Sequence, residues 1–139
     1  MSYILDTCML SESVKPRMNL GVQQWLENID DHHLFFSVIS LGEIQKGIAH
    51  LSDQHKKNSY SQWLDGVLIP KFANRILSVD MKIAKIWGDY LGNGLRKKVR
   101  IPEADALIAA TAHAFKFSVV TRNVSDFEIF GVNVANPWT

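Results

Sequence analysis

The sequence predicts an α/β protein in which a mostly parallel sheet of four to five strands lies between layers of helices. Short runs rich in Val, Ile, Leu and Phe alternate along the chain with longer segments whose apolar residues recur at helical spacing. Strands separated by helices pair in parallel through βαβ crossovers, which place helices on both faces of the sheet. The 139 residues are enough for one core but not for two, so we expect a single domain over residues 1–139.

The first half of the chain is expected to contain two strands and three helices. In chain order these are a strand over 3–5, a helix over about 19–29, a strand over 34–38, a helix from about 40 to 51 and a helix over 53–73. Ser40 and Glu43, three residues apart, have the form of a capping box at the start of the second helix. Pro70 is expected to interrupt the third helix.

The second half continues the alternation. Its expected elements are a strand over 75–79, a long helix that follows Asp80, a helix that begins at Pro102 and runs to Phe115, a strand over 118–121 and a short strand over 132–134. Asp80 directly precedes the apolar pattern of the long helix and is expected to cap it. No repeat, linker or low-complexity stretch divides the chain.

Composition excludes several classes of protein. With 47% hydrophobic and 21% charged residues, the chain is typical of globular proteins and not of disordered ones. Its one cysteine, Cys8, cannot form an internal disulfide, fits a reducing compartment and is expected to be buried packing. The N-terminus lacks a signal peptide and no apolar stretch is long enough to span a bilayer. We therefore expect a cytoplasmic protein without membrane association.

The charge of the chain is unevenly distributed although the net charge is only +1. Residues 1–70 hold five Lys and Arg against eight Asp and Glu, and residues 71–139 hold ten against six. Part of the second surplus is the run Arg96–Arg100. This run fits a solvated helix C-terminus, where cations complement the helix dipole, and it equally fits a surface that contacts phosphates.

Acidic and amide side chains gather where expected strands end or neighbouring helices begin. They are Asp6, Glu43, Asp80, Asp105, Asn123 and Asp126. Each alone is explained as a helix cap or a turn residue. The carboxyl ends of parallel strands meet at one edge of a sheet, however, where several carboxylates repel one another unless their charge is offset. A hard divalent cation offsets it, and such a cluster is typical of phosphodiester-cleaving sites. The five histidines show no zinc-binding spacing and are expected at the surface or in helix caps.

Four sequence blocks resemble the signature blocks of PIN domains, above all those of the VapC-type toxins of bacterial toxin–antitoxin modules. They are Ile4–Thr7, Ser40–Ile44, Asp105–Ala112 and Val120–Phe127, in order across almost the whole chain. The resemblance implies a PIN-like three-layer α/β/α fold and a Mg²⁺- or Mn²⁺-dependent endoribonuclease. It also implies an RNA substrate, a cognate antitoxin protein and a homodimer.

The resemblance also implies roles for individual residues. It places Asp6, Glu43 and Asp105 on the acidic positions that hold the metal in the family. Thr121 is implied to orient a water molecule. Asp80 lies outside the family's motifs and keeps its interpretation as a helix cap.

The fourth position of the site has two candidates. Asn123 stands where many relatives have Asp, and it carries no charge, so a second metal ion would be held less well. Asp126 lies three residues further on and reaches the site only if the loop geometry allows. We favour Asn123 as a close, water-mediated contact and treat Asp126 as the alternative ligand.

Two functions from different classes remain open. Hydrolysis by a metal-activated water needs no 2′-OH of the RNA, so a ribonuclease of this kind is expected to leave 5′-phosphate and 3′-OH ends. The alternative is a catalytically weak PIN-like binding subunit of a regulatory or repressor complex, which the uncharged Asn123 favours. Metal-dependent RNA cleavage by the purified protein separates the two.

Overall fold

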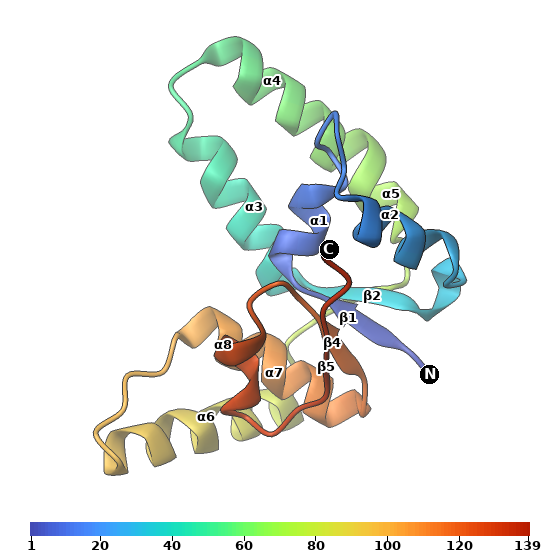
Figure 1. Cartoon of the computed structure of the whole chain (residues 1–139). Helices are drawn as coiled ribbons and strands as arrows, with labels where there is room; N and C mark the ends of the chain where they lie inside the picture. Colours follow the sequence, from blue (N-terminus) through green and yellow to red (C-terminus); the bar gives the residue numbers. More distant parts are fainter.

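A five-stranded, fully parallel sheet forms the centre of the protein (Figure 1). In this computed structural model, which describes residues 1–139, the strands are β1 Tyr3–Leu5, β2 Leu34–Ser37, β3 Ile76–Leu77, β4 Ser118–Val120 and β5 Val134–Ala135. Their order across the sheet is β3-β2-β1-β4-β5. The α/β class and the parallel sheet are confirmed, and the first strand of the chain occupies the central position.

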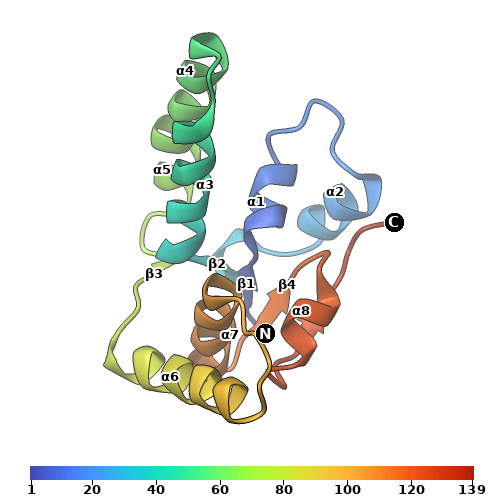
Figure 2. The ribbon, with the colours of Figure 1, turned by 90° about the vertical axis from the view of Figure 1, so that its left-hand side faces the viewer.

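Helices connect every pair of successive strands. They are α1 Thr7–Glu12, α2 Leu20–Glu27, the 3₁₀ turn η1 Asp31–His33, α3 Val38–His50, α4 Gln54–Trp63, the π-helical segment η2 Leu64–Leu68, α5 Ile69–Lys71, α6 Met81–Arg96, α7 Glu103–Phe115 and α8 Val124–Glu128. Figures 1 and 2 show α3, α4 and α5 as an arm that projects from the sheet, with α6 and α7 at the other end of the molecule. None of the helices combines the length and the apolar character needed to cross a membrane.

The two faces of the sheet are covered by different helices, which gives the predicted three layers. Ile4 and Val119 lie side by side in the sheet and pack on one face with residues of α7 and α8. The next residues, Leu5 and Val120, pack on the opposite face with residues of α1 to α5. This alternation follows from the period of two in a β-strand, where successive side chains point to opposite faces.

The start of α3 corrects one expectation. Ser40 was expected to cap this helix, but the helix begins at Val38, and the hydroxyl of Ser37 accepts the hydrogen bond from the Ile39 backbone N–H at 3.0 Å. Ser40 is buried inside the first turn. Two serines three residues apart are both acceptable caps, and the end of β2 at Ser37 decides between them. The helix α1 was not expected at all, because its six residues are too few to show a period.

Other boundaries follow the sequence closely. Asp80 caps α6, because its Oδ1 accepts a hydrogen bond from the Ile83 backbone N–H at 2.9 Å. The helical segment that follows Asp53 runs on from α4 through the π-helical turn η2 to Lys71, so it loses its regular register just before Pro70. The last strand lies at 134–135, slightly later than expected.

The last residues of the chain pack against the start of α2 at a position that requires glycine. A Cβ at Gly21 would lie 2.2 Å from the carbonyl oxygen of Pro137, and Asn19 Nδ2 donates a hydrogen bond to the Thr139 carbonyl at 3.0 Å.

We expect Gly21→Ala to destabilise the protein by about 1–3 kcal/mol, because backbone atoms have to move apart. Urea unfolding measures this change. Gly88→Ala, at an exposed position of α6 with open space, serves as the control and should be neutral or slightly stabilising; equal effects would contradict the steric argument.

Candidate functional site

Asp6 is fixed at the point where the two central strands end. Leu5 of β1 and Val120 of β4 are paired, so Asp6 and Thr121 follow them at the same edge of the sheet. Thr121 Oγ1 donates a hydrogen bond to Asp6 Oδ2 at 2.7 Å, and the Thr7 backbone N–H donates to Asp6 Oδ1 at 2.8 Å, which caps α1. The side chain is only 5% exposed. A carboxylate with both oxygens engaged in this way keeps one orientation.

Glu43 reaches the same edge from α3 and is tied to α1. Thr7 Oγ1 donates to Glu43 Oε1 at 2.7 Å and lies 3.0 Å from Ser40 Oγ. Thr7 therefore contacts both acidic residues, through its backbone N–H to Asp6 and through its hydroxyl to Glu43. Neither Thr7 nor Ser40 is among the site residues predicted from the sequence, although Thr7 directly follows Asp6 and Ser40 lies in the same sequence block as Glu43.

Asp105 lies in the first turn of α7 and shows that the carboxylates are close enough to repel one another. Its pKa is raised to about 6, chiefly because partial burial removes water from the carboxylate. The charges of Asp6, Asp126 and Glu43 raise the pKa further, in that order. The structure therefore brings four acidic residues, one from the N-cap of α1 and one each from α3, α7 and α8, into one electrostatic cluster.

The fourth position involves both of its candidates, Asn123 at the N-cap of α8 and Asp126 within that helix. Asn123 directly precedes the helix, is exposed, and its backbone N–H donates to Thr121 Oγ1 at 2.9 Å, whereas its side chain makes no capping bond. Asp126 is also exposed, but its charge contributes more to the raised pKa of Asp105 than that of Glu43 does. Asn123 lies next to the strand end as expected, and Asp126 is the one that adds charge to the cluster.

Thr121 and Cys8 support Asp6 rather than face a ligand. The hydroxyl of Thr121 is fully buried, donates to Asp6 and accepts from the Asn123 N–H, so it has no proton left with which to orient a water molecule. Cys8, expected only as packing, is half-buried with its Sγ 3.5 Å from both Asp6 Oδ2 and Thr121 Oγ1. Burial raises the pKa of the Cys8 thiol, which keeps its proton available for Asp6.

The donor set of this cluster fits a hard divalent cation. Its charged groups are all carboxylates, and Mg²⁺ and Mn²⁺ prefer oxygen ligands. The four carboxylates do not form a group of ligand atoms within 4.8 Å of one another. Mg²⁺ commonly retains several waters and takes only one or two carboxylates directly, so this looser arrangement suits it. A cation there would also offset the repulsion that adds to the effect of burial in raising the pKa of Asp105.

Comparison with known proteins assigns the family. A model of the PIN domain matches residues 3–129. The chain belongs to the PIN domain family. It is 36% identical over 135 residues to the plasmid stability protein StbB of Pseudomonas syringae pv. tomato, and it is 34% identical to the toxin FitB of Neisseria gonorrhoeae, with 97% of each chain covered in both cases. It is also 31% identical to the VapC ribonuclease Y4jK of Sinorhizobium fredii, covering 97% of this chain and 96% of that one.

A solved structure agrees with this assignment. The crystal structure of FitAcB from Neisseria gonorrhoeae superimposes with a TM-score of 0.88 at 34% identity, covering 98% of both chains. The resemblance to PIN domains and the three-layer architecture that it implied are thereby confirmed. The acidic cluster lies at the carboxyl edge of a PIN domain's central sheet.

Proposed function

We propose that this PIN domain is a metal-dependent endoribonuclease that acts as the toxin of a toxin–antitoxin module. The observation that carries the proposal is the cluster of Asp6, Glu43, Asp105 and Asp126, in which burial and, after it, the charges of the other three carboxylates raise the pKa of Asp105 to about 6. A relative named toxin FitB supports the toxin role, and a relative named VapC ribonuclease supports the nuclease activity.

In this proposal the cluster would hold Mg²⁺ or Mn²⁺ for action on the RNA phosphodiester. Asp6, Glu43 and Asp105 would hold the ion, directly or through its bound waters, and Asp126 supplies the fourth negative charge in place of Asn123. A cation at such a site makes water a stronger acid and offsets negative charge on the phosphodiester. Thr121 and Thr7 keep the carboxylates of Asp6 and Glu43 in place through their hydroxyls, so the site is preorganised before RNA binds.

The basic segment that precedes α7 is proposed to contact the RNA backbone. Lys97, Lys98 and Arg100 are all exposed and lie a few residues before Asp105.

We expect Lys98→Gln combined with Arg100→Gln to raise KM. The slope of log(kcat/KM) against log salt concentration should become shallower by roughly 1–2, because each lost phosphate contact releases about one counterion fewer. Lys56→Gln, an exposed change on α4, is the control; equal salt slopes in all three proteins would contradict the assignment.

An antitoxin is proposed to bind beside the acidic cluster. A hollow of about 420 Å³ runs between α1, α3 and α4, with Thr7 and Glu43 at its wall and apolar side chains such as Ile44, Ile48 and Trp63 along it. An apolar segment of a partner seated there would lie against a catalytic carboxylate. The hollow therefore offers a way for a partner protein to hold the nuclease inactive.

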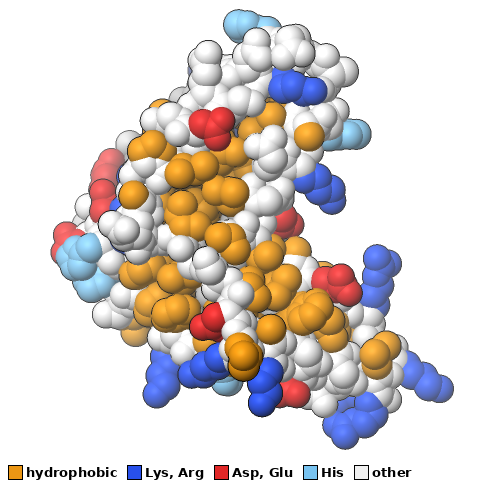
Figure 3. Space-filling model, turned by 180° about the vertical axis from the view of Figure 1, so that it is seen from behind, with side chains coloured by type: hydrophobic (Ala, Val, Ile, Leu, Met, Phe, Trp, Pro, Cys, Tyr) orange, Lys and Arg blue, Asp and Glu red, His pale blue; other side chains and the backbone are white.

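A homodimer is proposed from the exposed apolar surface. Figure 3 shows apolar side chains gathered over the middle of the face opposite to the view of Figure 1, where the arm of α3 to α5 joins the rest of the molecule. A contiguous apolar patch on a small protein is typical of an interface between subunits. Light scattering of the chain alone is expected to give twice the mass of one chain.

RNA cleavage by the tag-free, chelator-stripped protein tests the proposal. Adding Mn²⁺ or Mg²⁺ is expected to start cleavage that leaves 5′-phosphate and 3′-OH ends, and Asp6→Asn is expected to stop it, with the same folded circular dichroism spectrum as the wild type. RNA binding without metal-dependent cleavage would instead support the regulatory binding subunit.

Expression in cells tests the toxin role separately. The chain expressed alone should arrest growth, and Asp6→Asn should relieve the arrest at equal protein levels. If wild type and variant were equally harmful, the catalytic toxin would be ruled out even if the protein cleaves RNA in vitro.

A further inference from the structure

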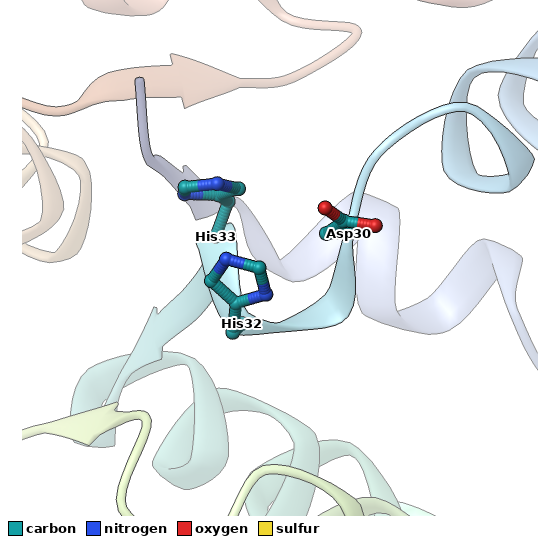
Figure 4. Close-up of side chains that lie close together, drawn as sticks. All are labelled: Asp30, His32 and His33. Carbon is teal, nitrogen blue, oxygen red and sulfur yellow. The ribbon is translucent and has the colours of Figure 1, made fainter.

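A second group of potential metal ligands lies at the opposite edge of the sheet from the acidic cluster. Asp30, His32 and His33 lie at the turn η1, and one ligand atom from each lies within 4.8 Å of the others (Figure 4). His33 directly precedes β2, whereas Asp6 directly follows β1, which runs parallel to it. The two groups are therefore separated by the length of the strands.

The side chains of this group are oriented for binding. The Nδ1 atom of His33 is hydrogen-bonded to Ser2 Oγ at 3.2 Å, which leaves Nε2 free. A hydrogen bond to the far ring nitrogen is the support that metal-bound histidines commonly have. Asp30 is at the N-cap position of η1, but its side chain makes no capping hydrogen bond, so its carboxylate oxygens are available. The rings of His32 and His33 lie 4.1 Å apart at an angle of 40°.

The backbone that carries these ligands is held on its other side by Arg75. Its guanidinium donates to the carbonyl oxygen of Asp31, inside the turn, and to that of Leu34, at the start of β2, the latter at 2.6 Å. The His33 backbone N–H donates to the Asp30 carbonyl at 3.0 Å and closes the turn. Ligands on such a fixed turn lose little conformational freedom when an ion binds.

We propose that Asp30, His32 and His33 form a site for a transition-metal ion such as Ni²⁺ or Zn²⁺. Two imidazole nitrogens and one carboxylate oxygen suit these ions, whereas Mg²⁺ prefers oxygen ligands alone. Asp30 and His32 are exposed and His33 is half-buried, so water completes the coordination and the ion exchanges with solvent. The site differs in both place and ligand chemistry from the carboxylate cluster.

Ni²⁺ titration of the tag-free, chelator-stripped full chain tests the site. In an Asp105→Asn background, which weakens the carboxylate cluster, one equivalent of Ni²⁺ is expected to bind, and His32→Ala or His33→Ala should weaken binding at least about tenfold. Ser2→Ala should weaken it by a comparable factor, because His33 loses its support. His50→Ala and His113→Ala, at exposed positions elsewhere, are the controls and should change nothing. The proposal would be overturned if Ni²⁺ did not bind, or if the affinity for Ni²⁺ were unchanged in both His32→Ala and His33→Ala.

This result is independent of the proposed ribonuclease activity. His32→Ala is expected to leave Mn²⁺-dependent RNA cleavage unchanged, because the site lies at the other edge of the sheet. Ni²⁺ binding without any RNA cleavage would support this site and contradict the nuclease. RNA cleavage without Ni²⁺ binding would support the nuclease and contradict this site.

Discussion

Replacing Asp105 by Asn is expected to stabilise the metal-free protein and, at the same time, to reduce metal-dependent RNA cleavage about a thousandfold. The stabilisation follows from the removal of a charge that burial and the charges of Asp6, Asp126 and Glu43 make unfavourable. The loss of cleavage follows from the removal of a proposed metal ligand. A change that helps the fold and harms activity is typical of a site that stores unfavourable charge for function.

The sign of the pH dependence follows from the direction of the shift. The pKa of Asp105 rises from its usual 3.8 to about 6 on folding, so the folded state favours the protonated form. This contribution to stability is present below the unfolded pKa and is lost as pH rises through about 6. Asp105→Asn should therefore match the wild type near about pH 4 and exceed it above pH 6 by about 1 kcal/mol, after allowance for solvent screening of a half-buried group.

Urea unfolding in the presence of a chelator measures this difference. Asp89→Asn, at an exposed position of α6, is the matched control and should show no such pH dependence. An Asp105→Asn protein that is less stable than the wild type near neutral pH would contradict the electrostatic argument. An active Asp105→Asn protein would contradict its role as a metal ligand.

Asp126→Asn is expected to weaken Mn²⁺ binding and RNA cleavage by about 10- to 100-fold, whereas Asn123→Ala should cost less than about tenfold. Asp126 carries a charge that acts on Asp105, and the exposed side chain of Asn123 makes no capping bond at the start of α8. Asn123→Asp should strengthen metal binding, because it adds a carboxylate next to the end of β4.

The pKa of Asp105, measured by carboxyl NMR, gives a second readout for the same pair. Asp126→Asn should lower this pKa, because one of the repelling charges is gone. Glu128→Gln, an exposed change on the same helix, should leave it unchanged. If Asp126→Asn changed neither the pKa nor cleavage while Asn123→Ala abolished cleavage, the fourth position would belong to Asn123.

The pattern of the sequence predicts the fold wherever local signals decide it. Each strand is a short apolar run, but the register of Ile4 with Val119 is not encoded locally, because the next residues, Leu5 and Val120, are also buried, on the opposite face. The order β3-β2-β1-β4-β5 depends on which crossover passes which face, and no local pattern encodes that. The sequence does not decide between Ser37 and Ser40 as the cap of α3, because both residues fit the same rule, and the expectation of Ser40 is wrong.

The candidate site was predicted as a set of charges but not as a set of contacts. Carboxylates at strand ends can be found from the sequence, because the ends of the apolar runs that form strands can be found from it, and ligands in such folds bind at the carboxyl ends of strands. The hydrogen bond from Thr7 to Glu43 joins residues 36 positions apart, and that from Thr121 to Asp6 joins residues 115 apart. The sequence predicts only a packing role for Cys8, because nothing in its neighbours along the chain indicates a contact with Thr121. Such pairings arise only after the sheet has formed.

Metal binding by the carboxylate cluster is the claim on which the proposed ribonuclease depends, and Mn²⁺ titration calorimetry at two pH values tests it most directly. The chelator-stripped protein is expected to bind Mn²⁺ near neutral pH and to bind it about tenfold more weakly near pH 5, because Asp105, with its pKa of about 6, must lose its proton for the ion to bind. Asp105→Asn should bind weakly at both values. No binding by the wild type, or binding that is equally tight in Asp105→Asn, would contradict the site.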